Sequence, residues 1–224
     1  MTGTVAEHGF LDAPACDAVL RQVHAMRPCW HRRMAEAPFF TLGTAAYLDA
    51  VSDGHDYAAR AAVSNAMLSA GFPTLLARLR DRLAGLLDAP VAYATHLALP
   101  GFHIFLSDPL FLNPVASVHV DLQYQLLPWP GDAAPDFAHP LSFTLPLALP
   151  RSGGGLNHTA TPRPRPHSTA QLDLYQPYQA GHLYLHSGHL LHQIAPLRAI
   201  APDDQRITLQ GHAVRQGGVW QLYW

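Results

Sequence analysis

The chain has 224 residues, of which 49% are hydrophobic and 13% are charged. This length suits a single domain, and the composition supplies enough apolar side chains for a buried core, which excludes a chain that is disordered throughout. The net charge is -2, from 14 basic and 16 acidic residues, and no run of basic residues occurs. The charge balance therefore gives no reason to expect a nucleic-acid partner.

The apolar stretches are interrupted by Pro, His or Asp well short of a membrane span, so no membrane partner is expected. The two cysteines are Cys16, early in a predicted helix, and Cys29, just past its end. On a helix rising about 1.5 Å per residue they lie too far apart to form a disulfide. Reduced cysteines and the absence of a secretory signal predict a cytoplasmic protein.

Residues 1–90 favour helices, which we expect to buttress a sheet. Between residues 13 and 27 the apolar positions recur at a spacing of three to four. A second helical stretch is predicted over residues 57–87, where Gly71 can end one helix and Pro73 can open the next.

Residues 91–224 consist of short apolar runs separated by Pro, Gly and Asn. The predicted strands span residues 91–99, 102–106, 116–125, 141–149, 170–175, 181–186, 189–194, 206–214 and 219–224. Many short strands at such even spacing favour an antiparallel sandwich or barrel. The predicted fold class is therefore mainly β with N-terminal helices, in one domain over residues 1–224 whose chemistry lies in the β part.

His119 and Asp121 stand two positions apart in the predicted strand 116–125. Side chains two apart on a strand face the same side, so both point one way while their apolar neighbours point the other. An imidazole and a carboxylate facing inward from an apolar strand need compensation for their burial, and a metal ion supplies it. One His and one carboxylate do not complete a site, so a further ligand must come from elsewhere.

The histidine-rich segment 181–196 is the best source of that ligand. It predicts a strand, a tight turn at Ser187-Gly188, and a second strand that carries His192. Fourteen residues later Arg206 begins another strand, with Thr208 on its same face. Such a pair makes a fork for a carboxylate.

The ordered set of His119-x-Asp121, then His192, then Arg206 resembles the iron(II)- and 2-oxoglutarate-dependent dioxygenase superfamily. The pattern of that superfamily is HxD, a distant His, and an Arg or Lys beyond it. The resemblance covers roughly residues 100–214. HxD alone is a weak signal because it is common by chance, whereas the ordered set is more specific.

Two glycine-led segments add to the resemblance. Residues 153–156 (Gly-Gly-Gly-Leu) resemble the family's glycine-rich turn between central strands. Residues 181–186 resemble its G-D-L-L-L-F strand, from which they depart at His182 and His186.

The resemblance also ranks the candidates for the third metal ligand. His186 lies where the family has a packing aromatic residue, and His189 falls just after the turn, where we expect it to be exposed. His192 alone has the Ile-Ala-Pro continuation and the right distance to Arg206. His192 is therefore preferred over His182, His186 and His189.

The resemblance implies a double-stranded β-helix (jelly-roll, cupin-like) that holds Fe(II) with His119, Asp121 and His192. It implies 2-oxoglutarate as cosubstrate, gripped by Arg206 with help from Thr208, and O2 as the oxidant. A facial triad of two His and one carboxylate leaves three adjacent positions open on iron. The expected reaction is hydroxylation of a small organic molecule, such as an amino acid or natural-product intermediate, with release of succinate and CO2. Because Asp121 is present, halogenation is disfavoured.

Four further residues are weaker candidates for contact with the substrate. They are His103, Gln123, Asn157 and Arg163. A core position for His103 and a solvated proline-rich loop (residues 159–168) for Arg163 are the competing interpretations. Other histidines are interpreted as structural or exposed, namely His139, His167, His189 and His212.

Three alternative functions remain at this point. One is a peptidyl side-chain hydroxylase of the same class. The others are a non-enzymatic cupin-like binding protein and a metalloenzyme that uses zinc or iron without 2-oxoglutarate. Arg206 with Thr208 argues against the last two, because neither needs a fork for a carboxylate there.

Overall fold

The computed structural model describes residues 5–50, 54–160 and 172–224. The helices are α1 (Ala13–Ala25), α2 (Ala46–Asp49), α3 (Gly54–Gly71) and α4 (Pro73–Leu87), with short 3-10 turns η1 (Arg27–Cys29), η2 (Pro109–Leu112) and η3 (Gln123–Leu126). The strands are β1 (Ala6–Gly9), β2 (His31–Arg32), β3 (Phe39–Leu42), β4 (Val91–Tyr93), β5 (Gly101–Leu106), β6 (Asp136–Ala148), β7 (Leu156–His158), β8 (Leu174–Gln176), β9 (His182–Ser187), β10 (His192–Ile194), β11 (Gln205–Gln216) and β12 (Val219–Tyr223).

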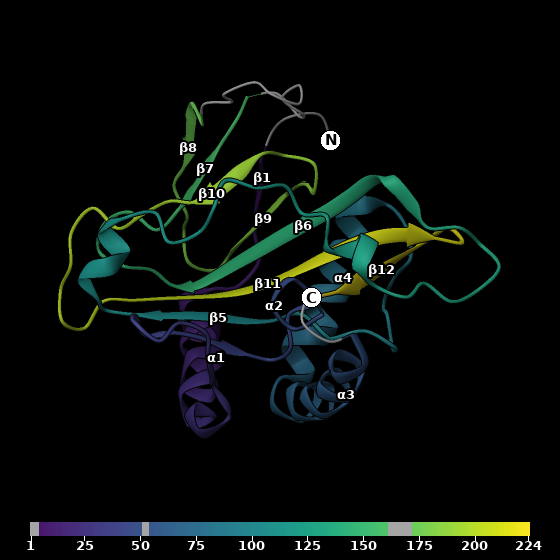
Figure 1. Cartoon of the computed structure of the whole chain (residues 1–224), viewed down its shortest axis with the longest axis horizontal. Coiled ribbons are helices and arrows are strands. Elements are labelled where there is room, and N and C mark those ends of the chain that lie inside the picture. Colours follow the sequence, from purple (N-terminus) through teal and green to yellow (C-terminus); the bar gives the residue numbers. More distant parts are fainter. Residues whose placement is uncertain (1–4, 51–53, 161–171) are drawn as a thin grey trace.

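The strands form two sheets. The large sheet has the order β1-β9-β6-β11-β5-β3-β2, and β12 joins it through β11 and pairs with β4. The small sheet has the order β10-β7-β8. Figure 1 shows the helices on one side of the large sheet and the small sheet on the other. The large sheet therefore separates the helices from the space between the two sheets.

The central strand β11 separates an apolar layer from a polar one. Ile207 and Leu209 are fully buried in the main hydrophobic core, against the helices. Arg206 and Gln210, in the alternate phase, line the cavity between the sheets. Because side chains alternate across a strand, one continuous segment serves both layers.

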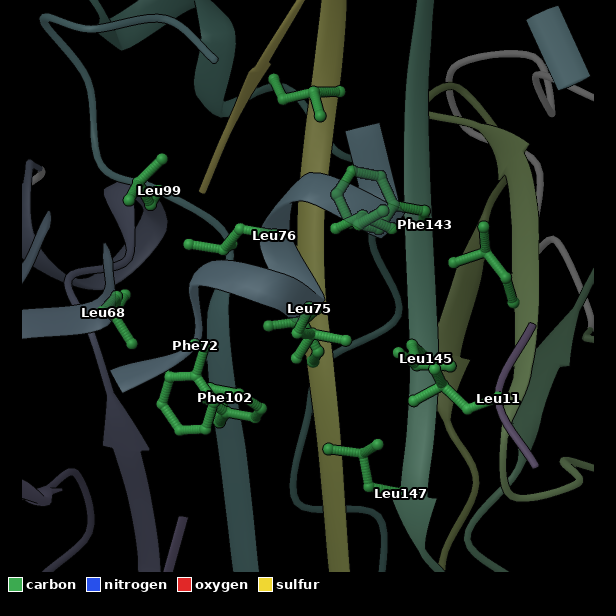
Figure 2. Close-up of a cluster of buried hydrophobic side chains, with 14 of the residues drawn as sticks. Leu11, Leu68, Phe72, Leu75, Leu76, Leu99, Phe102, Phe143, Leu145 and Leu147 are labelled. Atoms are coloured by element: carbon green, nitrogen blue, oxygen red, sulfur yellow. The ribbon is translucent and has the colours of Figure 1, made fainter. Parts of the chain in front are cut away.

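The helical layer packs through the leucines of α4. Its apolar positions Leu75, Leu76, Leu79 and Leu83 are buried at helical spacing and meet Phe102 and Leu145 of the sheet (Figure 2). Pro73 stands in the first turn of this helix, where its missing N–H costs nothing. At the start of α1, the Asp12 side chain accepts a hydrogen bond from the Ala15 amide at 2.9 Å, an ordinary N-cap.

The predicted fold class is confirmed, with corrections to individual elements. The first ninety residues contain β1, β2 and β3 as well as helices, and the strand predicted at 91–99 ends at Tyr93. The predicted strand 116–125 is wrong. Only His119 makes an isolated bridge, to His192, and residues 123–126 form η3. Burial explains this, because Gln123 and Tyr124 are adjacent and both buried, which a half-buried strand does not allow.

No helix within the described residues is both long and apolar enough to cross a membrane. Cys16 and Cys29 are both free thiols, the first buried and the second exposed.

Two glycines give a matched test of this packing. A side chain at Gly101 would overlap the ring of Trp224 and come within 2.7 Å of the Leu42 carbonyl oxygen, whereas Gly85 in α4 has nothing within 4 Å. Gly101→Ala should therefore destabilise the protein by about 1–3 kcal/mol. Gly85→Ala should stabilise it by about 0.5–1 kcal/mol, because it removes helix-interior glycine. Urea denaturation of both variants measures the difference, and equal midpoints would contradict the packing of Trp224 on β5.

Candidate metal centre

The structure brings His119, Asp121 and His192 together at the mouth of the space between the sheets. One ligand atom from each lies within 4.8 Å of the others, and no other such group of His, Cys, Asp or Glu occurs in the described part of the chain. The carboxylate of Asp121 is 3.7 Å from Nε2 of His119 and 3.7 Å from Nε2 of His192. Ligand atoms about 2 Å from one ion are separated by roughly 3–4 Å, so the three residues fit a single ion.

Backbone hydrogen bonds hold the three residues in place. The amide of His119 donates to the carbonyl of His192 at 3.0 Å, and the amide of His192 donates to the carbonyl of His119 at 2.9 Å. The amide of Asp121 donates to the carbonyl of Gly188 at 2.7 Å. Two segments more than sixty residues apart are thus joined at the ligands themselves.

The tautomers of both histidines are determined by carbonyl oxygens. Nδ1 of His119 lies 2.8 Å from the Ser117 carbonyl, and Nδ1 of His192 lies 2.8 Å from the Leu190 carbonyl. A carbonyl only accepts, so each Nδ1 carries the proton and donates it. Each Nε2 therefore presents a lone pair to the space beside Asp121, as a metal ligand requires.

The Asp121 carboxylate is buried and ionised. Burial opposes its ionisation, but in acid, where they are protonated, the imidazoles of His192, His212 and His186 outweigh burial and hold the pKa of Asp121 well below its usual range. The Ser142 hydroxyl donates to Oδ2 at 2.6 Å, which further orients the carboxylate. A buried anion surrounded by neutral bases is the environment that a divalent cation stabilises.

The buried histidines His192, His186 and His212 beside Asp121 are neutral at pH 7. Burial lowers the pKa of His192 to about 4, and Asp121 only partly opposes that shift. Burial also lowers the pKa of His186 and of His212. His192 is thus unprotonated over the physiological range, the form in which it binds metal.

A cavity of about 400 Å³ extends from this triad between the two sheets. Its polar lining, besides the triad, is Tyr47, His103, Gln123, Gln125, Ser142, Thr144, Tyr178, His186, Arg206, Gln210 and His212. Its apolar lining is Ala116, Val120, Leu122, Leu126, Phe143, Leu156 and Ile194. Both the triad and Arg206 therefore face one chamber of the size of a small-molecule site.

The Arg206 side chain is buried in the wall of this cavity, only 3% exposed. Its Nε donates to the Gly154 carbonyl at 2.8 Å, and its Nη2 has no hydrogen-bond partner among the described residues. Its guanidinium lies between the rings of Phe105 and Tyr178, at 5.5 and 5.8 Å from their centroids. No described carboxylate forms an ion pair with it. A buried cation with an unpaired donor is a binding site for an anion.

The remaining predicted residues have different positions. Thr208 is fully buried and does not line the cavity. Its hydroxyl accepts a hydrogen bond of 3.5 Å from Nη1 of Arg206 and so helps to hold the guanidinium in place. Gln123 and His103 both line the cavity. Asn157 is half-buried on β7 and is absent from the lining, while Arg163 and His167 lie outside the described residues.

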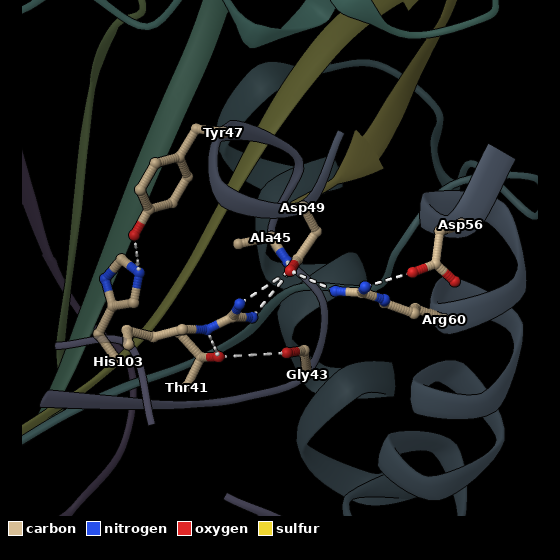
Figure 3. A network of polar contacts seen from close by, with 9 residues as sticks. Thr41, Gly43, Ala45, Tyr47, Asp49, Asp56, Arg60 and His103 are labelled. Atoms are coloured by element: carbon tan, nitrogen blue, oxygen red, sulfur yellow. Dashed lines mark hydrogen bonds and ion pairs between the residues drawn. The ribbon is translucent and has the colours of Figure 1, made fainter. Parts of the chain in front are cut away.

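His103 is buried, and its Nε2 forms a hydrogen bond of 2.6 Å with the Tyr47 hydroxyl (Figure 3). Tyr47 lies on α2, a helix of four residues that is anchored through Asp49. Arg33 makes two hydrogen bonds of 2.8 Å to the Asp49 carboxylate, and Arg60 lies 3.4 Å from it. The ion pairs at Asp49 therefore place Tyr47 over the cavity.

Two histidine predictions are corrected. His189 is buried, 9% exposed, and lies 3.1 Å from the Tyr124 hydroxyl, because the turn at 188–189 folds it inward. His212, predicted to be structural or exposed, is largely buried and lies beside the triad, since its Nδ1 is 3.9 Å from the Asp121 carboxylate and 3.0 Å from the Ser142 hydroxyl. His212 shares the phase of Arg206 on β11, a signal that sequence reasoning had available and did not extend.

The buried neutral histidines predict a loss of stability in acid. Below pH 6.5 the unfolded chain binds protons at these histidines while the folded chain, with lowered pKa values, does not. The free energy of unfolding should therefore fall as the pH falls from about 6.5 to about 4, with His192 alone contributing on the order of 3 kcal/mol. Urea denaturation of metal-free protein across this range measures it. His186→Gln should flatten the fall and the exposed His31→Gln should not; a pH-independent midpoint would refute the burial argument.

No protein-family model and no curated protein matches the sequence. Among solved structures, the chain is similar to an N-substituted L-amino acid dioxygenase from Burkholderia ambifaria AMMD, in complex with alpha-KG. The TM-score is 0.56 at 14% identity, over 98% of this chain and 85% of that one. It is also similar to AviO1 from Streptomyces viridochromogenes Tue57, with a TM-score of 0.50 at 13% identity, over 93% of this chain and 89% of that one.

At these identities the likeness is one of fold, and it spans nearly the whole chain. The predicted double-stranded β-helix is thereby confirmed, and the chain shares the architecture of a solved dioxygenase.

Proposed function

We propose that this protein is an iron(II)- and 2-oxoglutarate-dependent oxygenase. The observation that carries the proposal is the pairing, in one cavity, of the His119–Asp121–His192 triad with the buried, unpaired guanidinium of Arg206. A keto acid with a second carboxylate has one end for each of these sites. A simple metal hydrolase or a cupin-like binding protein does not need the second site, the guanidinium of Arg206.

The residues of the triad fit iron(II). Two neutral imidazoles and one carboxylate are the donor set of non-haem iron oxygenases, and they leave adjacent positions open for other ligands. When bound, iron would supply the activation of dioxygen that couples oxidation of 2-oxoglutarate to oxidation of a substrate. Ser117, Leu190 and Ser142 accept or donate the hydrogen bonds that orient the three ligands.

The chain's own residues hold the cosubstrate away from water. Arg206 presents Nη2 to its distal carboxylate, while Gly154 and Thr208 fix the guanidinium from the other side. Phe105 and Tyr178 flank the guanidinium and lower the local dielectric, which strengthens a charge-assisted hydrogen bond. The pKa of Arg206 is lowered by burial, as expected of a cation that lacks its counter-ion.

The substrate proposed is a small organic molecule, such as an amino acid or natural-product intermediate. A cavity of about 400 Å³ is of the right size, and one solved structure of the same fold is named for a substituted amino acid. Gln123 and His103 are the predicted contacts that line it. A peptidyl side-chain hydroxylase is the alternative, favoured by the exposed Leu122 and Leu126 at the cavity. A cytoplasmic location remains part of the proposal, consistent with the free thiols.

Anaerobic titration tests the metal and the cosubstrate together. Addition of iron(II) and then 2-oxoglutarate should give the visible charge-transfer band of a keto acid chelated to iron(II). Asp121→Ala should abolish the band and iron binding, because it removes the only carboxylate of the triad. Asp17→Ala, an exposed carboxylate on α1, is the matched control and should leave both unchanged. Iron binding without a band in the wild type would favour a metalloenzyme that does not use 2-oxoglutarate.

Arg206 tests the cosubstrate site separately. Arg206→Ala should spare iron binding and weaken 2-oxoglutarate binding by about 2–5 kcal/mol, because a buried charge-assisted pair is lost. Arg215→Ala, an exposed arginine on the same strand, should change neither affinity. The measurement is calorimetric titration of the zinc-loaded protein with 2-oxoglutarate. Undiminished affinity in Arg206→Ala would refute the assigned role of this strand.

A further inference from the structure

A second, apolar cavity lies directly behind the metal cavity. Its walls are mostly apolar and include Phe105, Phe111, Val115 and Ile194. Ile194 and Arg206 line both cavities, so they form the partition between them. Ile194 follows His192 by two residues on β10 and shares its phase, which directs its side chain toward the metal side.

The walls of this second cavity are stiff. Phe105 stacks on Phe39 with ring centroids 4.3 Å apart, and Phe111 meets Phe105 edge-on at 5.2 Å. Phe105 and Phe111 are buried in a small hydrophobic cluster of their own, against which Val115 and Ile194 pack. Rings held in this way do not collapse into a neighbouring void, because each already has close-packed partners.

The space inside is about 20 Å³, enough for one molecule of the size of water. Water needs two or more polar partners, and almost all of the surface that lines this space is apolar. The Ser107 hydroxyl donates to the Ala201 carbonyl at 2.6 Å, and the Asp204 carboxylate accepts from the Ala201 amide at 2.9 Å. Apolar spaces of this size hold water poorly and take up small apolar molecules.

We propose that this cavity binds dioxygen and passes it to the metal cavity past Ile194. Dioxygen is a small apolar molecule that gains dispersion contacts and loses no hydrogen bonds on entering such a space. The proposal rests on the proposed function only in that an oxygenase consumes this gas. It adds a binding site for the gas that is separate from the metal and from Arg206's carboxylate site.

Dissolved dioxygen is paramagnetic and so reports its own position. The chain has four isoleucines, Ile104, Ile194, Ile200 and Ile207, so a methyl spectrum labelled at isoleucine has one reporter and three internal references. Ile104 and Ile207 are fully buried in the main core, and Ile200 is half-buried. Under oxygen pressure, in zinc-loaded protein with 2-oxoglutarate, the Ile194 methyl should relax several-fold faster than the three references. Equal enhancement at all four methyls would overturn the proposal.

Filling the cavity supplies the matched variant. Val115→Trp adds bulk at a half-buried wall position outside the regular strands and should remove the excess relaxation at Ile194. Val63→Trp, at a position 74% exposed on α3, adds the same side chain elsewhere and should preserve it. Unchanged signals of Ile104 and Ile207 show that each variant is folded. Persistence of the excess in folded Val115→Trp would place the gas elsewhere and overturn the proposal.

A kinetic measurement separates this inference from the proposed function. Val115→Trp should raise the KM for dioxygen several-fold in 2-oxoglutarate turnover, with the affinity for 2-oxoglutarate unchanged. A normal charge-transfer band with no relaxation excess at Ile194 would refute the gas site and leave the oxygenase intact. A relaxation excess without the band would refute the oxygenase and leave the gas-binding cavity.

Discussion

The alternation of side chains along β11 is the constraint on which the rest of the structure depends. This strand pairs with β5, β6 and β12, and it must satisfy an apolar layer on one face and a polar chamber on the other. Ile207 and Leu209 pack in the core with the helices, while Arg206 and His212 line the chamber. A shift of one residue in register would bury a guanidinium among leucines, so the fold and the site are specified together.

The chamber contains two buried charged groups, one acidic and one basic, that have no partner of opposite charge within the described residues. Asp121 lies among neutral imidazoles, and Arg206 lies among aromatic rings with a free donor. Burying either group costs free energy unless a partner of opposite charge arrives. A divalent cation and a dicarboxylate together neutralise both ends, which connects the electrostatics of the folded chain to the ligands that we propose for it.

Sequence reasoning reached the parts of the site that depend on order and periodicity. The spacing of His119 and Asp121, the later His192 and the phase of Arg206 are local or ordered features, and the structure brings these residues to one cavity. Sequence reasoning failed where tertiary contacts determine the local structure. The segment 116–125 leaves the ladder because Tyr124 and Gln123 are both drawn inward. Tyr47 carries no periodic signal, since its helix has four residues and owes its position to Arg33 and Asp49. Ser142 was overlooked for a different reason, because only its pairing with His212 across β6 and β11 reveals it beside Asp121.

The reciprocal amide bonds between His119 and His192 have a consequence for metal selection. They fix both donors before any ion arrives, so capture of a metal requires little ordering of the chain. A preformed pocket of two nitrogens and one oxygen follows the general order of divalent affinities, in which copper, nickel and zinc exceed iron. The scaffold therefore does not itself reject these competitors. Loading with the ferrous ion that we propose would therefore depend on which metals are available around the protein.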